Sequence, residues 1–122
     1  MYEITKRFTF EAAHVLSWHE GKCKRTHGHS YKLEVTIASR ELTEKGVVMD
    51  FGELSKIVDS EIISKYDHQL LNEFFLNPTA ELMAREIFGS LETYFYKAVL
   101  KPTIVRVKLW ETENCSVTIN QK

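Results

Sequence analysis

The first fourteen residues alternate between apolar and polar side chains, as expected for a strand with one buried face. The apolar positions recur at every second residue and end on a histidine: they are Tyr2, Ile4, Phe8, Phe10, Ala12 and His14. Lys6 is the exception on that face. Because side chains two residues apart on a strand point to the same side, residues 2–14 predict a half-buried strand that carries His14 at its end.

A second alternating stretch covers residues 27–40. Its apolar face begins with two histidines and comprises His27, His29, Tyr31, Leu33, Val35 and Ile37. Residues 15–26, between the two stretches, follow neither a strand nor a helix period and predict a long loop. If the two strands pair antiparallel, the end of the first lies beside the start of the second.

The period changes from two to between three and four after Asp50. Residues 41–46 predict a turn and residues 47–49 a short strand, before a run of apolar residues with helical spacing: Phe51, Leu54, Ile57, Val58 and Ile62. This spacing predicts an amphipathic helix, and Asp50 is a good N-cap residue for it. Residues 67–72 predict a connection.

A second helix is predicted from Thr79, its N-cap, to about residue 100. Its apolar positions are Met83, Ile87, Leu91, Phe95 and Ala98. Two final strands follow at residues 103–111 and 115–120. On the first of these, one face carries Val105, Val107, Leu109 and Glu111. Cys115 alternates with apolar residues and is expected to be a small core residue.

The order of elements predicts an α+β domain, with a four-stranded antiparallel sheet and two helices packed on one face. Residues 1–122 are expected to form a single domain, because a chain of this length supports one hydrophobic core. A four-stranded sheet has two open edges, and unpaired edges attract other chains. We therefore expect the protein to be a homo-oligomer.

Charge and cysteine content narrow the classes of function. The chain has 16 Lys and Arg residues against 17 Asp and Glu residues, a formal net charge of -1. A chain with this balance has no excess positive charge that would attract nucleic acid or an anionic membrane. The beginning of the chain has no signal-peptide pattern, and no apolar run approaches the length of a membrane span. Two cysteines in this context indicate free thiols and a cytoplasmic location.

Three histidines, His14, His27 and His29, converge at one end of the predicted sheet if its first two strands pair. Any one of them alone would be read as an ordinary polar or core residue, so the convergence favours a metal site. Three neutral imidazoles suit Zn²⁺ and leave a fourth position for water or substrate, as in catalytic zinc sites. Cys23, in the intervening loop, is a possible fourth ligand that would close the site. His19 is expected to be exposed.

Cys23 has cationic neighbours: Lys22, Lys24 and Arg25. Positive charges stabilise a thiolate and lower its pKa, which makes the thiol a better base or nucleophile. The alternative is a surface thiol in a charged loop.

Three carboxylate and imidazole side chains are further candidates. Asp67 and His68 offer a proton relay, because a carboxylate near an imidazole fixes its tautomer and raises its pKa. A helix-end cap accounts for this dipeptide equally well. Glu111 follows apolar residues on its strand face, so its carboxylate must be paired or bind a polar ligand unless it reaches water at the strand end.

The motifs that carry these residues resemble one protein family in order and spacing. They are Phe10-Glu11-Ala12-Ala13-His14, Cys23-x-x-x-His27-Gly28-His29, Asp67-His68-x-x-Leu71-Asn72, Asn77-Pro78-Thr79-x-Glu81 and Trp110-Glu111-Thr112. This set is similar to that of the 6-pyruvoyl-tetrahydropterin synthase family. The three-residue gap between Cys23 and His27 resembles the 6-carboxy-tetrahydropterin synthases of queuosine biosynthesis, whereas pyruvoyl synthases of animal type have a longer gap.

The resemblance implies a tunnelling fold, in which three subunits close a barrel and two trimers can form a hexamer. It implies that His14, His27 and His29 hold zinc, that Cys23 is a base and that Asp67 and His68 relay protons. Glu111 would anchor the pterin ring and share in the relay, at a site between subunits.

The implied substrate is 7,8-dihydroneopterin triphosphate, and the implied products are 6-carboxy-5,6,7,8-tetrahydropterin, acetaldehyde and triphosphate. Two alternatives remain open: a pyruvoyl synthase on the same scaffold, and a zinc-containing pterin-binding module without turnover.

Overall fold

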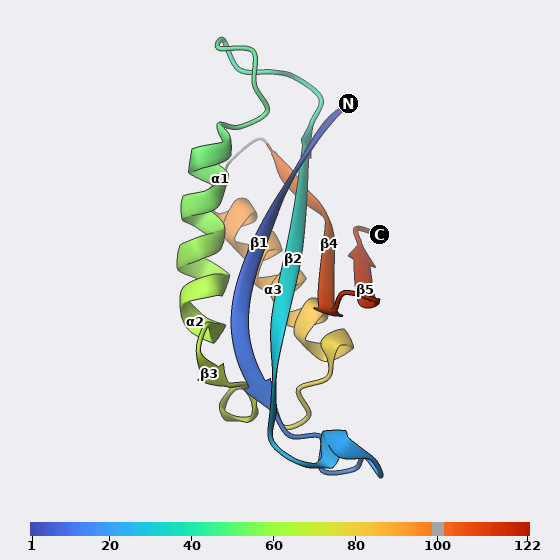
Figure 1. The fold of residues 1–122 in the computed structure, drawn as a ribbon. Helices are drawn as coiled ribbons and strands as arrows, with labels where there is room; N and C mark the ends of the chain where they lie inside the picture. The colour runs from blue at the N-terminus through green and yellow to red at the C-terminus, as the bar shows by residue number, and fades with distance from the viewer. Residues whose placement is uncertain (99–101) are drawn as a thin grey trace.

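The core of the protein is a five-stranded sheet in the order β3-β1-β2-β4-β5. The computed structural model describes residues 1–98 and 102–122, except the side chain of Cys23. The two longest strands are β1 (Tyr2–His14) and β2 (His27–Ser39) (Figure 1). Both confirm the strands predicted from alternation. No helix in the described part of the chain is long and apolar enough to cross a bilayer.

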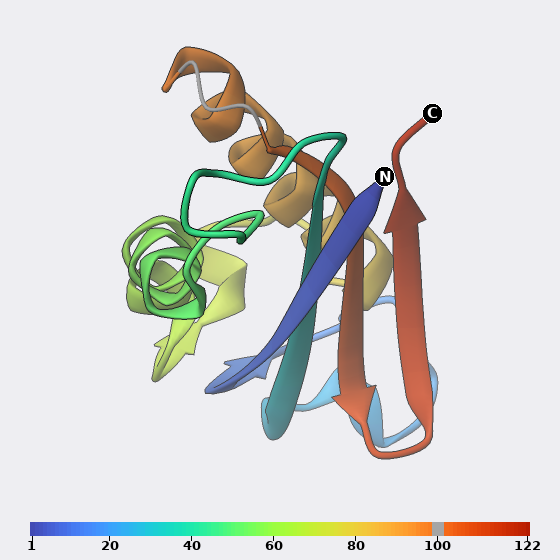
Figure 2. The ribbon, with the colours of Figure 1, turned by 90° about the horizontal axis from the view of Figure 1, so that it is seen from above.

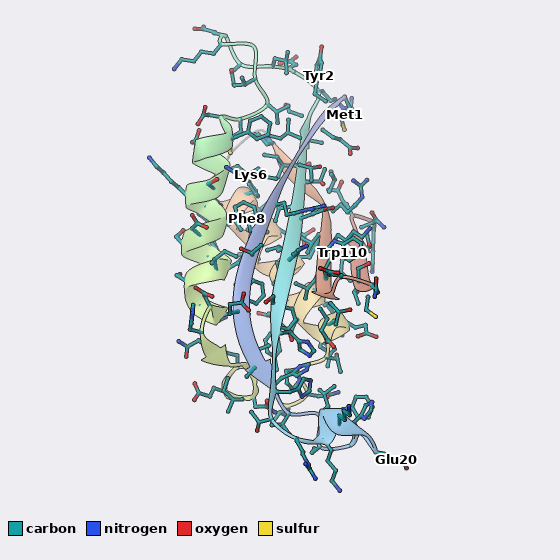
Figure 3. The ribbon with its side chains drawn as sticks, viewed as in Figure 1. Met1, Tyr2, Lys6, Phe8, Glu20 and Trp110 are labelled. Carbon is teal, nitrogen blue, oxygen red and sulfur yellow. The ribbon has the colours of Figure 1, made fainter. Side chains whose placement is uncertain are left out.

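β1 and β2 pair antiparallel over their whole length, from Tyr2 opposite Ser39 to His14 opposite His27. The apolar face of each strand forms the core, and the side chains of Phe10, Leu33, Val35 and Ile37 are buried there. Figure 3 shows Lys6 and Phe8 on the helix side of β1. The Lys6 ammonium nitrogen lies 3.5 Å from the Phe51 carbonyl oxygen, so the one charged residue on this face reaches a polar partner at the start of a helix.

The helices cover one face of the sheet, as predicted (Figure 2). α1 (Phe51–Val58) continues through a π-helical segment (Asp59–Ile63) into α2 (Ser64–Tyr66). The carboxylate of Asp50 accepts hydrogen bonds from the backbone N–H groups of Gly52 and Glu53, which confirms it as the N-cap.

The second predicted helix is α3 (Ala80–Lys97), and Thr79 caps it by accepting a hydrogen bond from the backbone N–H of Leu82. The last two positions of the predicted helix, 99 and 100, lie outside the described residues.

The prediction of four strands is wrong by one short strand. β3 (Gln69–Leu70) lies in the segment predicted as a connection and pairs parallel with Ala12 and Ala13 of β1. Two residues are too few to show alternation, so the sequence pattern could not reveal this strand. β3 brings the Asp67-His68 dipeptide against the outer edge of β1.

Two register shifts interrupt β4 (Thr103–Thr112). The first places Ile104 opposite Ile37 and Val107 opposite Val35, so Ile104 is buried where alternation predicts Val105. A bulge of this kind adds one residue to a strand and changes the face of those beyond it. The second shift lies at Glu111, between Trp110 and Thr112.

Two smaller predictions also need correction. β5 (Cys115–Asn120) is present, but Cys115 is exposed because it lies at the turn end of the β4–β5 hairpin rather than in the core. Residues 47–49 form no strand. Val48 and Met49 are buried in the core from a loop instead, which accounts for their apolar character.

Asp50→Ala tests the capping interaction at α1. We expect the free energy of unfolding to fall by about 1 kcal/mol, because two N–H groups of the first turn lose their acceptor. Urea denaturation followed by circular dichroism measures this change. Asp59→Ala, which removes an exposed carboxylate from within the helical segment, is the control and should change stability less. Equal stability of Asp50→Ala and the wild type would contradict the capping role.

Candidate metal centre and active site

The Nε2 atoms of three histidines meet where β1 ends and β2 begins. His14 Nε2 lies 2.9 Å from His27 Nε2 and 3.1 Å from His29 Nε2. One nitrogen from each of the three residues lies within 4.8 Å of the others. The pairing of His14 with His27 brings the first two rings together, and His29 reaches the same point because it is two residues further along the same face of β2. The predicted convergence is therefore present.

Backbone carbonyl groups determine which nitrogens of these rings carry hydrogen. His14 Nδ1 lies 2.9 Å from the Pro78 carbonyl oxygen, and His27 Nδ1 lies 2.8 Å from the Arg25 carbonyl oxygen. Because a carbonyl only accepts hydrogen bonds, Nδ1 of both rings must be the N–H donor. In the neutral rings both Nε2 atoms then carry lone pairs, and these face each other. A cation bound between them would turn that repulsion into coordination, so the donor set fits a metal with a preference for imidazole nitrogen.

The floor of this site is buried and uncharged. His14 has no exposed surface, and Tyr31 beneath it is equally buried. The Tyr31 ring stacks on Phe10 with a centroid distance of 5.0 Å, and its hydroxyl lies 3.4 Å from His14 Nδ1. Burial raises the pKa of Tyr31 far above its ordinary value of 10.0, and the Glu111 carboxylate raises this pKa further. The phenol of Tyr31 therefore stays neutral beside the histidine rings.

Glu111 lies beside the histidine cluster. Its Oε1 is 3.4 Å from His29 Nε2, and the two side chains are only 23% and 14% exposed. Burial lowers the pKa of His29 below 6.5 despite the opposing effect of the Glu111 carboxylate. His29 is therefore neutral at neutral pH, as a metal ligand must be. Glu111 lies two residues after Leu109, which pairs with Leu33 of β2, so alternation along β4 places its side chain on the face that carries His29.

Asp67 and His68 are held against the edge of β1 by the backbone of Glu11. The Glu11 N–H donates to Asp67 Oδ1 at 2.9 Å, and the His68 N–H donates to the Glu11 carbonyl oxygen at 2.6 Å. Asp67 Oδ2 lies 3.1 Å from His68 Nδ1. The hydrogen bond from the Glu11 N–H lowers the pKa of Asp67 below 3.8, and the bond from His68 acts in the same direction.

The dipeptide takes an unusual backbone shape. His68 has a φ of 60°, a left-handed conformation that residues other than glycine seldom adopt. Its imidazole is 77% exposed. His68 and His29 line the same open depression, together with Gly28 and the end of β1. Of the three clustered histidines, His29 is the one that lines this depression with His68.

Cys23 belongs to the loop that connects the end of β1 to the start of β2. Its backbone belongs to a short 3-10 turn, Lys22–Lys24. The side chain lies outside the described residues, so its predicted role stays a prediction. His19 lies in the same loop, and its Nδ1 accepts a hydrogen bond from the Gly21 N–H.

Sequence reasoning did not identify two residues that contact the cluster. Tyr31 continues the apolar face of its strand, so alternation predicts a core position and no contact with the histidines. Pro78 contributes a carbonyl group, which every residue has, so its side chain gives no sign of this contact.

Comparisons with known proteins identify the family of this chain. The family model described as 6-pyruvoyl tetrahydropterin synthase matches residues 3–122. The chain is 45% identical over 98 residues to the 6-carboxy-5,6,7,8-tetrahydropterin synthase of Synechocystis sp., which covers 75% of this chain and 76% of that protein. It is 34% identical over 137 residues to the protein of the same name from Haemophilus influenzae, covering 92% and 94% of the two chains.

The fold also matches a solved structure. The 6-pyruvoyl tetrahydropterin synthase of Caenorhabditis elegans superposes with a TM-score of 0.82 at 25% sequence identity, over 99% of this chain and 96% of that chain. A two-helix α+β fold and a three-histidine cluster define a pterin synthase scaffold with a possible metal centre. The chain belongs to the 6-pyruvoyl tetrahydropterin synthase family.

His27→Ala tests the ligand set. Loss of a residue that supports a metal ligand typically weakens metal binding about 10- to 100-fold, so we expect loss of a ligand itself to cost more. Elemental analysis of the purified protein and competition with a chelator measure zinc content and affinity. His19→Ala, which changes a histidine of the neighbouring loop, should bind zinc like the wild type. Unchanged zinc content in His27→Ala would refute the ligand set.

Proposed function

We propose that this protein is a zinc-dependent lyase. It converts 7,8-dihydroneopterin triphosphate and water to 6-carboxy-5,6,7,8-tetrahydropterin, acetaldehyde and triphosphate in queuosine biosynthesis. The observation that carries this proposal is the 45% identity to a 6-carboxy-5,6,7,8-tetrahydropterin synthase. The three facing imidazoles give that likeness a chemical basis in this chain.

Zinc is the metal that best suits the donor set. Zn²⁺ accepts three imidazoles and keeps a further position for substrate, and no fourth ligand from a described residue joins His14, His27 and His29 in the cluster. When bound, zinc would supply Lewis-acid polarisation of the substrate's side-chain oxygens. The hydrogen bonds to Pro78 and Arg25 direct the lone pairs of two ligands towards the metal position.

The remaining residues of the site bind the substrate and move protons. We assign to Cys23 the role of the base, because its cationic neighbours favour the thiolate. Asp67 holds the His68 imidazole on the rim of the depression, so His68 can exchange a proton with a substrate seated there. Glu111 accepts hydrogen bonds from the N–H groups of the pterin ring, because a carboxylate only accepts.

The arrangement of the chain favours an assembly that completes this site. The depression beside His29 is open, and β3 and β5 present free edges in the single chain. Pairing of these edges between subunits would remove both exposed edges. We propose a trimer-based homo-oligomer, with a hexamer as the larger form, acting on a small pterin in the cytoplasm.

The activity is tested by incubating the zinc-loaded protein with 7,8-dihydroneopterin triphosphate. We expect acetaldehyde and 6-carboxy-tetrahydropterin to appear in equal amounts, measured by a coupled aldehyde assay and by chromatography of the pterin. Protein treated with a chelator is the control. A pyruvoyl product without acetaldehyde would favour the pyruvoyl synthase alternative. Absence of turnover by protein that binds zinc would favour the non-catalytic pterin-binding module.

Cys23→Ala tests the role of the thiol. General base catalysis contributes about 10²- to 10⁴-fold to a rate, so we expect kcat to fall by that order while zinc content stays unchanged. Cys115→Ala is the matched control, because Cys115 is an exposed thiol on the β4–β5 hairpin. Full turnover by Cys23→Ala would exclude the thiol from the mechanism.

A further inference from the structure

The end of β1 is held from the outside by one side chain, that of Asn72. Asn72 Oδ1 accepts a hydrogen bond from the Val15 N–H at 2.8 Å, and Asn72 Nδ2 donates to the Val15 carbonyl oxygen at 3.0 Å. Both polar groups of one backbone residue are therefore satisfied by a single carboxamide. This pattern is the one that a neighbouring strand would provide, since a strand residue also offers one donor and one acceptor.

The chain fixes the position of this carboxamide. β3 pairs with β1 at Ala12 and Ala13, and Asn72 continues the contact two residues beyond the end of β3. Leu71, next to Asn72, has no exposed surface and begins a 3-10 turn that is closed by a hydrogen bond from the Phe74 N–H. The buried leucine and the turn hold Asn72 at the edge of the sheet.

The residue held in this way directly follows a metal-binding histidine. Val15 is the neighbour of His14, whose ring is oriented by the carbonyl of Pro78. The segment 71–78 thus holds His14 at two points. Asn72 binds the backbone of the next residue, Val15, and the Pro78 carbonyl accepts a hydrogen bond from the imidazole. A shift of the Val15 backbone would carry His14 away from the His27 and His29 nitrogens, which lie 2.9 and 3.1 Å from its own.

We propose that Asn72 is a positioning residue for the metal centre. By binding both backbone groups of Val15, it holds His14 in the orientation in which its Nε2 faces the other two ligands. This inference rests on the three-histidine centre of the proposed function and deepens it. Asn72 also connects the histidine cluster with the Asp67-His68 dipeptide. It lies on the same segment as the dipeptide and binds the residue that follows His14.

The exposure of Asn72 makes the proposal testable. Its side chain is exposed in the single chain, so its replacement removes no packing from the core. Asn72→Leu keeps a similar shape without hydrogen bonds, and Asn72→Ala removes the side chain. Asp50→Ala is a matched control for stability, since it also removes a side chain that makes two hydrogen bonds to the backbone, but at α1. Asn77→Ala is a local control, since it removes a bond to Trp18 within the same segment.

Two measurements need no substrate. Zinc affinity is determined by chelator competition, and the geometry of the ligands by the visible absorption of the Co²⁺-substituted protein. We expect both Asn72 variants to bind zinc about tenfold more weakly, the lower end of the range for residues that support a ligand, and to show an altered Co²⁺ spectrum. Both controls should retain wild-type affinity and spectrum. Faster hydrogen exchange at the Val15 N–H in the Asn72 variants would locate the change.

The outcomes separate this inference from the proposed activity. Wild-type affinity and spectrum in both Asn72 variants would overturn the positioning role, as would an equal loss of zinc in Asp50→Ala, which would indicate a general effect of stability. A wild-type protein that binds no zinc would overturn it as well. If the wild type binds zinc and the Asn72 variants bind it weakly, the inference stands even where the pterin assay shows no lyase activity.

Discussion

The site depends on one constraint, the antiparallel register of β1 and β2. Thirteen consecutive pairs join these strands, and the last of them places His14 opposite His27. Because side chains alternate along a strand, a slip of one residue would turn every buried side chain outward. Burial of Phe10 and Leu33 in the core therefore fixes the register that also brings the histidines together. The stability of the core and the geometry of the cluster have the same origin.

The register of β1 and β2 does not position the other candidate residues, and irregular backbone features lie next to them. Glu111 stays in step with Leu109 and so faces His29, and the bulge at this position shifts the pairing of β4 with β5. The two-residue strand β3 and the left-handed backbone of His68 set the Asp67-His68 dipeptide on the edge of β1. Each of these departures from regular structure lies next to a candidate functional residue, as is common for bulges and unusual backbone conformations.

The sequence predicts the features that repeat and misses those that do not. Alternation over residues 2–14 identifies β1 because many core positions agree, and Asp50 and Thr79 are predicted because capping depends on local chemistry. β3 is too short for a period, and the bulge in β4 depends on the strand that it pairs with. The three histidines were predictable because they lie on regular strands. The support from Pro78 and Asn72 was not, because it comes from residues more than fifty positions away in sequence.

The Nε2 atoms of His14 and His27 face each other, and their lone pairs repel each other when both rings are neutral. The carbonyls of Pro78 and Arg25 fix Nδ1 as the N–H of two rings, so their Nε2 lone pairs are directed at each other in a buried place. Rotation of the His14 ring would relieve this repulsion but would break its hydrogen bond to the carbonyl of buried Pro78, and a buried carbonyl without a partner is unfavourable. Protonation of one ring or a metal ion between the rings would remove the repulsion. The same hydrogen bonds hold the rings in the orientation in which a metal ion could be bound, and the strand register brings the three histidines together.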